Sequence, residues 1–191
     1  MTSLDILITI LSLFYIYFAT QNKIVCFVFG LFASGLWAYH DFANLNLKFD
    51  GFLQLFYVAM SVWGLYKWKK GTSNNDELPI TSMNLKEHFL VIFISLVLGV
   101  GLAWITRNIM ETALPYLDAI TTAFAIVVTY MLIQRKLENW IYWILIDAAY
   151  IYIFINQDAP MLAGIMGVYT LLAIYGYNEW RKITVSADSR I

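Results

Sequence analysis

Cysteine, histidine and charged residues are scarce in this sequence of 191 residues, and each shortage excludes a class of chemistry. The single cysteine, Cys26, allows neither an internal disulfide nor a thiolate metal cluster. The two histidines, His40 and His88, are expected near opposite membrane faces, too far apart to share a metal ion. GxxxxGK[ST], GxSxG and HExxH motifs are absent. We therefore predict a protein that is not an enzyme, holds no metal or other cofactor, and does not use ATP directly.

Charge of either sign is equally sparse. Charged residues make up 13% of the chain and hydrophobic residues 61%, with a net charge of −1. Soluble domains carry about 25% charged residues. The basic residues form no patch beyond the expected loops, which gives no basis for nucleic-acid binding. The composition predicts an all-α protein that crosses a lipid bilayer several times.

Apolar segments long enough to cross a bilayer occur along the whole chain, since a helical span needs about 20 residues. Several contain polar residues, which favours helices that pack on one another. We predict seven transmembrane helices in a single domain of residues 1–191. They cover residues 4–20, 24–43, 51–69, 88–107, 114–133, 138–155 and 159–180.

The first and last thirds of the chain repeat each other in the same direction. Nine residues recur at a shift of 112 or 113 positions. The pairs are Asp5 with Asp118, Thr9 with Thr122, Tyr17 with Tyr130, Gln21 with Gln134, Lys23 with Lys136, Tyr57 with Tyr169, Gly64 with Gly176, Trp68 with Trp180 and Lys70 with Lys182. Each copy has three helices, an odd number, so two consecutive copies would cross the membrane in opposite directions. One further helix between the copies restores the same direction. We predict repeats over 4–70 and 113–183, a cytoplasmic linker plus fourth helix over 71–112, and a substrate site between the repeats.

Lysine and arginine are distributed unequally over the predicted loops. Ten of the twelve fall on the side of the C-terminus, and only Lys48 and Arg107 fall on the other. Because cytoplasmic loops are enriched in basic residues, we predict an inner-membrane protein with its N-terminus outside and its C-terminus in the cytoplasm. Within the linker, Asn84 and Glu87 have the spacing of a helix cap. The polar tail, 184–191, is expected to be frayed.

Polar and aromatic residues share one face of the segment 138–155. Trp140, Trp143, Asp147 and Tyr150 fall within about 80° of arc at 100° per residue. A carboxylate near the middle of a span costs about 2.5–3.5 kcal/mol, and no Lys or Arg lies at that depth. We expect Asp147 to face a cavity in which a cationic ligand supplies the missing charge, with Trp143 as a cation–π surface. The structural alternatives are a neutral or hydrogen-bonded carboxyl group for Asp147, plain helix packing for Trp143, and a place in the aromatic belt at the cytoplasmic boundary for Trp140.

Two other segments carry candidate ligand contacts. In 51–69, Gln54 and Tyr57 lie on one stripe, and in 114–133 two threonine hydroxyls could turn inward. Helix-to-helix hydrogen bonds, or threonine bonds to their own backbone, are the alternatives. Gly64 and its repeat partner suit close helix packing, and Trp68 and Trp180 are expected as anchors at the inner boundary. The candidate substrate-binding residues are Gln54, Tyr57, Thr121, Thr122, Trp140, Trp143, Asp147 and Tyr150.

Three motifs resemble the PnuC transporter family over about residues 5–182. They are DAITTAFAIVVTYMLIQRKLENWIYWILID at 118–147, FGLFASGLWAYHDF at 29–42 and LQxFYxxMSxxG at 53–64. The resemblance implies a three-one-three fold similar to full-length SWEET sugar transporters, assembled as a homotrimer. It also implies uptake of nicotinamide riboside by facilitated diffusion, with trapping by a cytoplasmic kinase.

The sequence departs from the family at two places. Asp147 stands where many riboside transporters have Asn, and Val128-Thr129 stands where Ala-Gln is common. The PnuT relatives share the Asp and are associated with thiamine, so a PnuT-type thiamine transporter is the alternative. Both vitamins are cationic aromatics. A SWEET-like sugar facilitator is a further alternative, although sugars do not call for a mid-membrane carboxylate. A membrane receptor or assembly subunit that transports nothing is another, although it would not need polar stripes in both repeats.

The repeat also predicts where the substrate is recognised. We expect Trp143 and Asp147 to align near Phe27 and Leu31 in the first copy, which have different chemistry. The substrate is then recognised by residues that only the second copy possesses.

Overall fold

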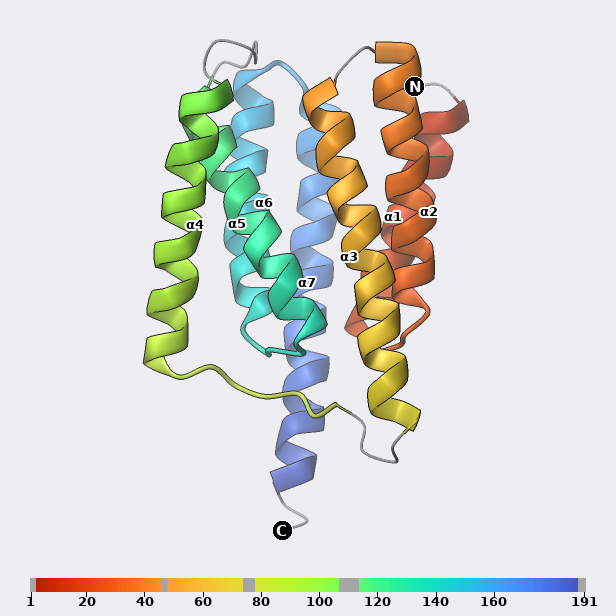
Figure 1. Ribbon diagram of the computed structural model, residues 1–191, viewed down its shortest axis with the longest axis vertical. Helices are drawn as coiled ribbons and strands as arrows, with labels where there is room; N and C mark the ends of the chain where they lie inside the picture. The colour runs from red at the N-terminus through yellow and green to blue at the C-terminus, as the bar shows by residue number, and fades with distance from the viewer. Residues whose placement is uncertain (1–2, 46–47, 74–77, 107–113, 189–191) are drawn as a thin grey trace. The chain divides into compact units, whose positions relative to one another are not determined.

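The computed structural model describes residues 3–45, 48–73, 78–106 and 114–188 (Figure 1). Across these residues seven α-helices follow one another, as the hydropathy pattern predicted, and one short π-helix extends the second. They are α1 (Ser3–Thr20), α2 (Cys26–His40), η1 (Asp41–Leu45), α3 (Lys48–Ser73), α4 (Leu85–Thr106), α5 (Pro115–Ile133), α6 (Asn139–Asn156) and α7 (Pro160–Asp188). The chain divides into two compact units, Met1–Pro79 and Ile80–Ile191.

Four of the described helices are long and apolar enough to cross a membrane by length and composition. They are α1, α4, α5 and the part of α7 from Pro160 to Ser186. The α2 helix has only 15 residues before η1 continues it. The finding supports a multi-pass membrane protein, and seven spans stay a prediction.

In the first unit, α2 packs against both α1 and α3. Gly64 permits the close approach of α3, because a Cβ atom there would overlap the ring of Phe27. That ring also meets Trp68 edge-on, with centroids 4.9 Å apart and planes at 87°. Phe27 and Trp68 are each 1% exposed. Trp68 therefore serves helix packing, and its place at the inner membrane boundary stays a prediction.

In the second unit, α6 packs against both α5 and α7 through an arrangement of the same kind. A Cβ atom on Gly176 would lie 2.7 Å from Cε2 of Trp140. The Trp140 ring meets Trp180 edge-on, with centroids 5.5 Å apart and planes at 90°. Trp180 is fully buried, so it too is a packing residue. The positions that repeat in the sequence thus make equivalent contacts in each unit.

The α4 helix joins the second unit by packing against α5. Its buried residues are small and share one stripe: Ser95, Gly99, Ala103 and Thr106. A Cβ atom on Gly99 would lie 2.9 Å from the Cα atom of Ile120. Small residues allow such close backbone contact between membrane helices. Large apolar side chains cover the rest of α4 and remain exposed, as on a helix that faces lipid.

The turns after α1 and α5 have the same backbone structure at a shift of 113 residues. Each closes its helix with a Schellman motif, and the residues at its centre, Asn22 and Arg135, both have φ of 54°. Five backbone N–H to C=O bonds of 3.0–3.2 Å recur in each turn. They are Gln21 to Tyr17 and Gln134 to Tyr130, Asn22 to Ala19 and Arg135 to Leu132, Lys23 to Phe18 and Lys136 to Met131, Cys26 to Lys23 and Asn139 to Lys136, and Val28 to Val25 and Ile141 to Glu138.

This shared geometry fixes the register between α2 and α6. Trp140 corresponds to Phe27, and not Trp143 as expected from the sequence. At the same shift Trp143 corresponds to Gly30, and Asp147 corresponds to Ser34. The expected alignment with Phe27 and Leu31 was therefore wrong by three residues, although the chemical difference between the copies stands.

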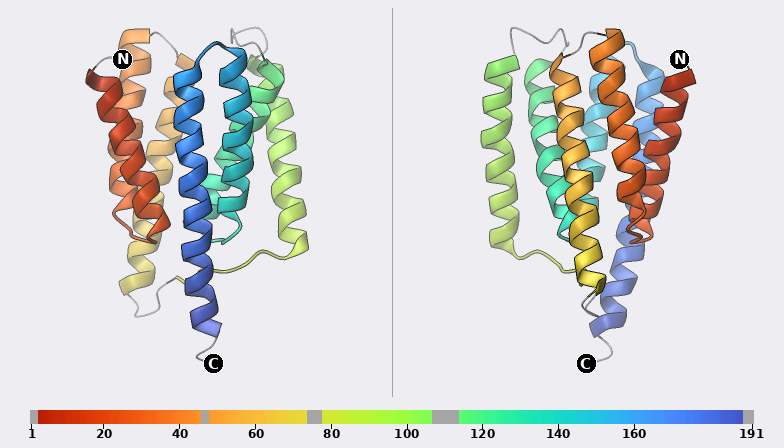
Figure 2. Two further views of the ribbon diagram at one scale, coloured as in Figure 1. Left: turned by 180° about the vertical axis from the view of Figure 1, so that it is seen from behind. Right: turned by 45° about the vertical axis from the view of Figure 1, so that its right-hand side comes forward.

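The polar linker after the third helix and the polar C-terminal tail both contain more helix than the sequence indicated. The α3 helix continues to Ser73, and α7 continues to Asp188, past the turn between α5 and α6 (Figure 2). The frayed tail was thus a wrong prediction for 184–188, and its last three residues lie outside the described residues. The cap on α4 is confirmed. Asn84 Oδ1 accepts the N–H groups of Lys86 and Glu87 at 3.0 Å, and Glu87 Oε2 accepts the Asn84 N–H at 2.8 Å.

Replacing Asn84 with Ala should fray the first turn of α4. The substitution removes the acceptor for two amides, and loss of such a cap costs about 1 kcal/mol. We expect the amides of Lys86 and Glu87 to exchange with deuterium roughly fivefold faster. Asn178→Ala is the matched control, because that side chain bonds its own helix at Ile174 C=O. Equal exchange in both variants would contradict a capping role.

Candidate functional site

The centre of the candidate site is Asp147, on the inward face of α6. Its side chain is only 4% exposed. Among the described residues, its carboxylate has neither an ion pair nor a hydrogen bond. An unpaired buried charge is unfavourable, and charged residues inside spans mark ligand or ion sites. That a cation completes this site stays a prediction.

Trp143 lies one helical turn before Asp147 on the same face. It is partly buried and packs against a cluster of apolar side chains in α5 and α6. The cluster consists of Ala125, Val128, Met131, Tyr142 and Ile146. The indole is thus held by packing, while the carboxylate lies next to it along the helix. An aromatic face and a carboxylate together suit an aromatic cation.

Hydroxyl groups join α5 and α6 one turn further along. Thr122 Oγ1 lies 3.2 Å from the Tyr150 hydroxyl. Thr121 instead donates to the C=O of Leu117 at 2.7 Å, within its own helix. Two neighbouring threonines therefore have different roles, since Thr122 faces α6 and Thr121 follows the backbone-bonded alternative. Both are buried.

Trp140, one of the candidate substrate-binding residues, packs between helices in the structure. The residue is 3% exposed, and its ring packs against Gly176 and Trp180. Among the described residues, its Nε1 atom has no hydrogen-bond partner. Contact between Trp140 and a substrate stays a prediction.

Gln54 and Tyr57 belong to α3, in the first unit, and both are half-buried. The Tyr57 ring meets Phe56 edge-on at 5.5 Å. Ser61 and Gly64 lie one and two turns after Tyr57 on the same face of α3, and both are buried, so this face of α3 points inward. Whether Gln54 and Tyr57 share one site with the α6 residues stays a prediction.

Sequence reasoning missed a contact between α4 and α6. His88 Nδ1 lies 2.9 Å from the Tyr142 hydroxyl, and the two rings stack with centroids 5.9 Å apart. Tyr142 also stacks on Phe124 at 6.5 Å. The two partners are 54 residues apart, and no motif or periodicity connects them. This contact ties α4 to the helix that carries Trp143 and Asp147.

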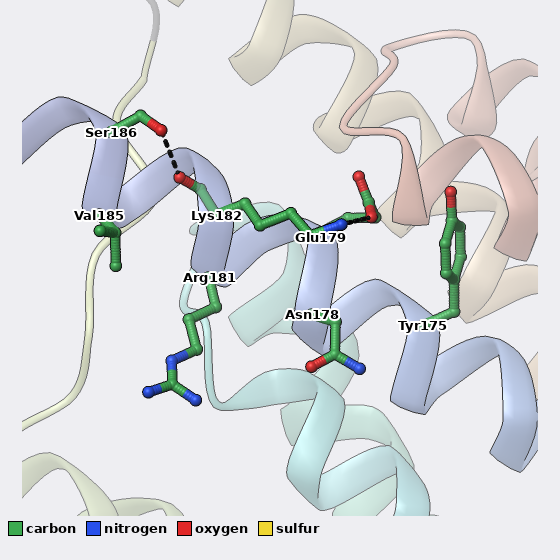
Figure 3. A pocket seen from close by; sticks show the side chains of 7 residues that line it. All are labelled: Tyr175, Asn178, Glu179, Arg181, Lys182, Val185 and Ser186. Atoms are coloured by element: carbon green, nitrogen blue, oxygen red, sulfur yellow. Dashed lines mark hydrogen bonds and ion pairs between the residues drawn. The ribbon is translucent and has the colours of Figure 1, made fainter.

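An open hollow occurs elsewhere, on the last turns of α7 (Figure 3). Within it Lys182 Nζ donates to Glu179 Oε1 at 2.6 Å, and Ser186 donates to the Lys182 C=O. All its lining residues come from this one helix, and none is a predicted site residue. They are Tyr175, Asn178, Glu179, Arg181, Lys182, Val185 and Ser186. The hollow is not the candidate site.

A helical membrane protein with a buried polar face on one of its helices has the features of a small-molecule transporter. The family described as "Nicotinamide mononucleotide transporter" matches residues 2–182. The chain belongs to this family of membrane transporters, and the expected resemblance to PnuC proteins is confirmed.

Individual relatives agree with the family. The chain is 28% identical over 179 residues to the nicotinamide riboside transporter PnuC of Neisseria mucosa, covering 87% of the chain and 67% of the relative. It is 25% identical over 207 residues to that of Escherichia coli K12, covering 95% and 86%. A crystal structure of the vitamin B3 transporter PnuC has the same fold, with a TM-score of 0.76 and 23% identity, covering 96% of this chain and 82% of that one.

Proposed function

We propose that the chain takes up nicotinamide riboside across a bacterial inner membrane. The observation that carries the proposal is the buried carboxylate of Asp147, which has no partner among the described residues and lies one turn from Trp143. Nicotinamide riboside is a cationic aromatic compound. Its ring would lie on Trp143, and its positive charge would face Asp147.

The remaining candidate residues would contact the neutral parts of this substrate. The hydroxyls of Thr122 and Tyr150, 3.2 Å apart, can each exchange one partner for a ribose hydroxyl. Gln54 can both donate to and accept from the carboxamide, with Tyr57 beside it. Thr121 and Trp140 would complete the walls. This assignment requires α3 and α6 to face one central site.

The proposed mechanism is facilitated diffusion through a SWEET-like three-one-three arrangement. The matching turns and the matching Gly–aromatic contacts of the two units support two related three-helix sets. The two sets would rock about the site and expose it to each side in turn. A cytoplasmic kinase would then trap the vitamin by phosphorylation. The basic-residue distribution supports an outside N-terminus, and we propose a homotrimer from the resemblance.

Uptake into proteoliposomes tests the proposed function. Purified protein should admit labelled nicotinamide riboside down its gradient and release it again when the gradient is reversed. Empty liposomes are the control. Uptake of neither nicotinamide riboside nor thiamine, by correctly oriented protein, would contradict the whole class of cationic-vitamin transport.

Thiamine is the second candidate, and Asp147 is the observation that favours it. A carboxylate stands where many riboside transporters have Asn, and PnuT relatives share this Asp. Both compounds should be tested in the same vesicles, each as a competitor of the other. The compound that competes at the lower concentration is the better substrate.

A further inference from the structure

The segment that leads into α4 is paired with the turn between α5 and α6. Thr81 N–H donates to the C=O of Arg135 at 3.0 Å, and Leu137 N–H donates to the C=O of Thr81 at 3.0 Å. These two bonds form one parallel β-bridge, with Thr81 opposite Lys136. The backbone before α4 is thereby joined directly to the turn that leads into α6 (Figure 1).

Two side-chain contacts lengthen this connection. Glu138 Oε2 accepts the N–H of Met83 at 2.9 Å. Lys136 Nζ donates to Glu87 Oε1 at 2.7 Å and forms an ion pair. Both involve a charged group, and such hydrogen bonds are the stronger ones. The connection therefore extends from the linker into the first turn of α4.

The contacts continue along α4 itself. His88 Nδ1 lies 2.9 Å from the Tyr142 hydroxyl of α6. Three turns further on, Gly99 brings the α4 backbone against Ile120 of α5. Helix α4 is thus fixed to α6 through its N-terminal end and to α5 through its middle. A joint that bends between α4 and the second three-helix set would have to break these contacts.

We propose that residues 80–88 form a strap that makes α4 and the second three-helix set move as one body during transport. The joint between the moving parts then lies outside this body. Glu138 and His88 act as positioning residues, because they hold the helix that carries Trp143 and Asp147. The proposal rests on the proposed transport function and adds which half of the protein carries α4.

A reversible cross-link across the strap tests this inference. Thr81→Cys and Lys136→Cys, in a Cys26→Ala background, place two thiols at the bridged pair, where strand neighbours are close enough for a disulfide. Oxidation should cross-link most of the protein. Uptake by the oxidised protein should stay within twofold of the reduced protein, because the two residues do not separate in the cycle. The single-cysteine variants, treated alike, are the controls.

Three other outcomes would contradict the joint motion, the backbone pairing or the transport function, respectively. A fall in uptake of more than tenfold on oxidation, reversed by dithiothreitol, would show that the strap opens and that α4 does not move with the second set. Failure to cross-link, or unprotected exchange of the Leu137 amide in the native chain, would show that the pairing is absent. If neither the native chain nor the reduced variant takes up either vitamin, the proposed function fails, and the cross-linking yield decides the strap alone.

Discussion

Replacing Asp147 with Asn should weaken binding of the cationic vitamin by more than tenfold. The amide has nearly the same size as the carboxyl group, so the change removes charge and little else. Because no described residue pairs with the carboxylate, no charged group among the described residues would compete with a cationic substrate for it. A tenfold loss corresponds to about 1.4 kcal/mol, a modest value for a charge pair shielded from water. Calorimetric titration of the purified protein, or KM for uptake, measures the change.

Asp158→Asn provides the matched control for this substitution. Asp158 is exposed, and its φ of 53° lies in the left-handed region, which Asn tolerates. The same chemical change there should leave affinity unaltered. Binding of a neutral sugar should also be insensitive to Asp147→Asn. Unchanged affinity for both vitamins would mean that the carboxyl group is neutral in the binding state, and the electrostatic basis of the proposed site would then be wrong.

The sequence predicted the helices well because hydropathy and helix caps are local properties. All seven segments became helices, and the Asn84 cap formed with the spacing that predicted it. The linker was described less well. Its pairing of Thr81 with Lys136 joins residues 55 positions apart, and one β-bridge leaves no periodicity to detect. The polar ends of α3 and α7 are helical because a helix can continue through polar residues. Hydropathy detects only the apolar part of such a helix, so these ends were not predicted.

The candidate site was predictable wherever one face of one helix was in question. At 100° per residue Trp143, Asp147 and Tyr150 fall together, and α6 places them on its inward side. The register between the repeats could not be predicted, because positions three residues apart lie on the same helix face. Trp140 and Trp143 were thus interchangeable in sequence, and only the equivalent turn geometry distinguished them. Thr121 and Thr122 lie 100° apart around the helix axis, and only the structure shows that Thr122 is the one that faces α6.

Gly64→Ala should destabilise the first unit, because the added Cβ atom would overlap the ring of Phe27. In a helix interior, Ala is otherwise favoured over Gly by about 1 kcal/mol. Overpacking costs about 1–3 kcal/mol when the neighbour cannot move, and the Phe27 ring is also packed edge-on against Trp68. We expect a lower melting temperature in detergent, by about 2–4 °C for each kcal/mol of net loss. Gly176→Ala should act in the same direction through Trp140.

Gly167→Ala is the control that separates crowding from the loss of a glycine. A Cβ atom at Gly167 meets nothing within 4 Å, so helix propensity alone should act there, and stability should stay level or rise. Phe27→Leu, combined with Gly64→Ala, should recover part of the lost stability, because the smaller side chain makes room for the new methyl group. An additive loss in the double variant would contradict the direct contact. In that case the contact between an aromatic ring and a glycine would not be what stabilises the packing of α2 on α3, or the equivalent packing of α6 on α7.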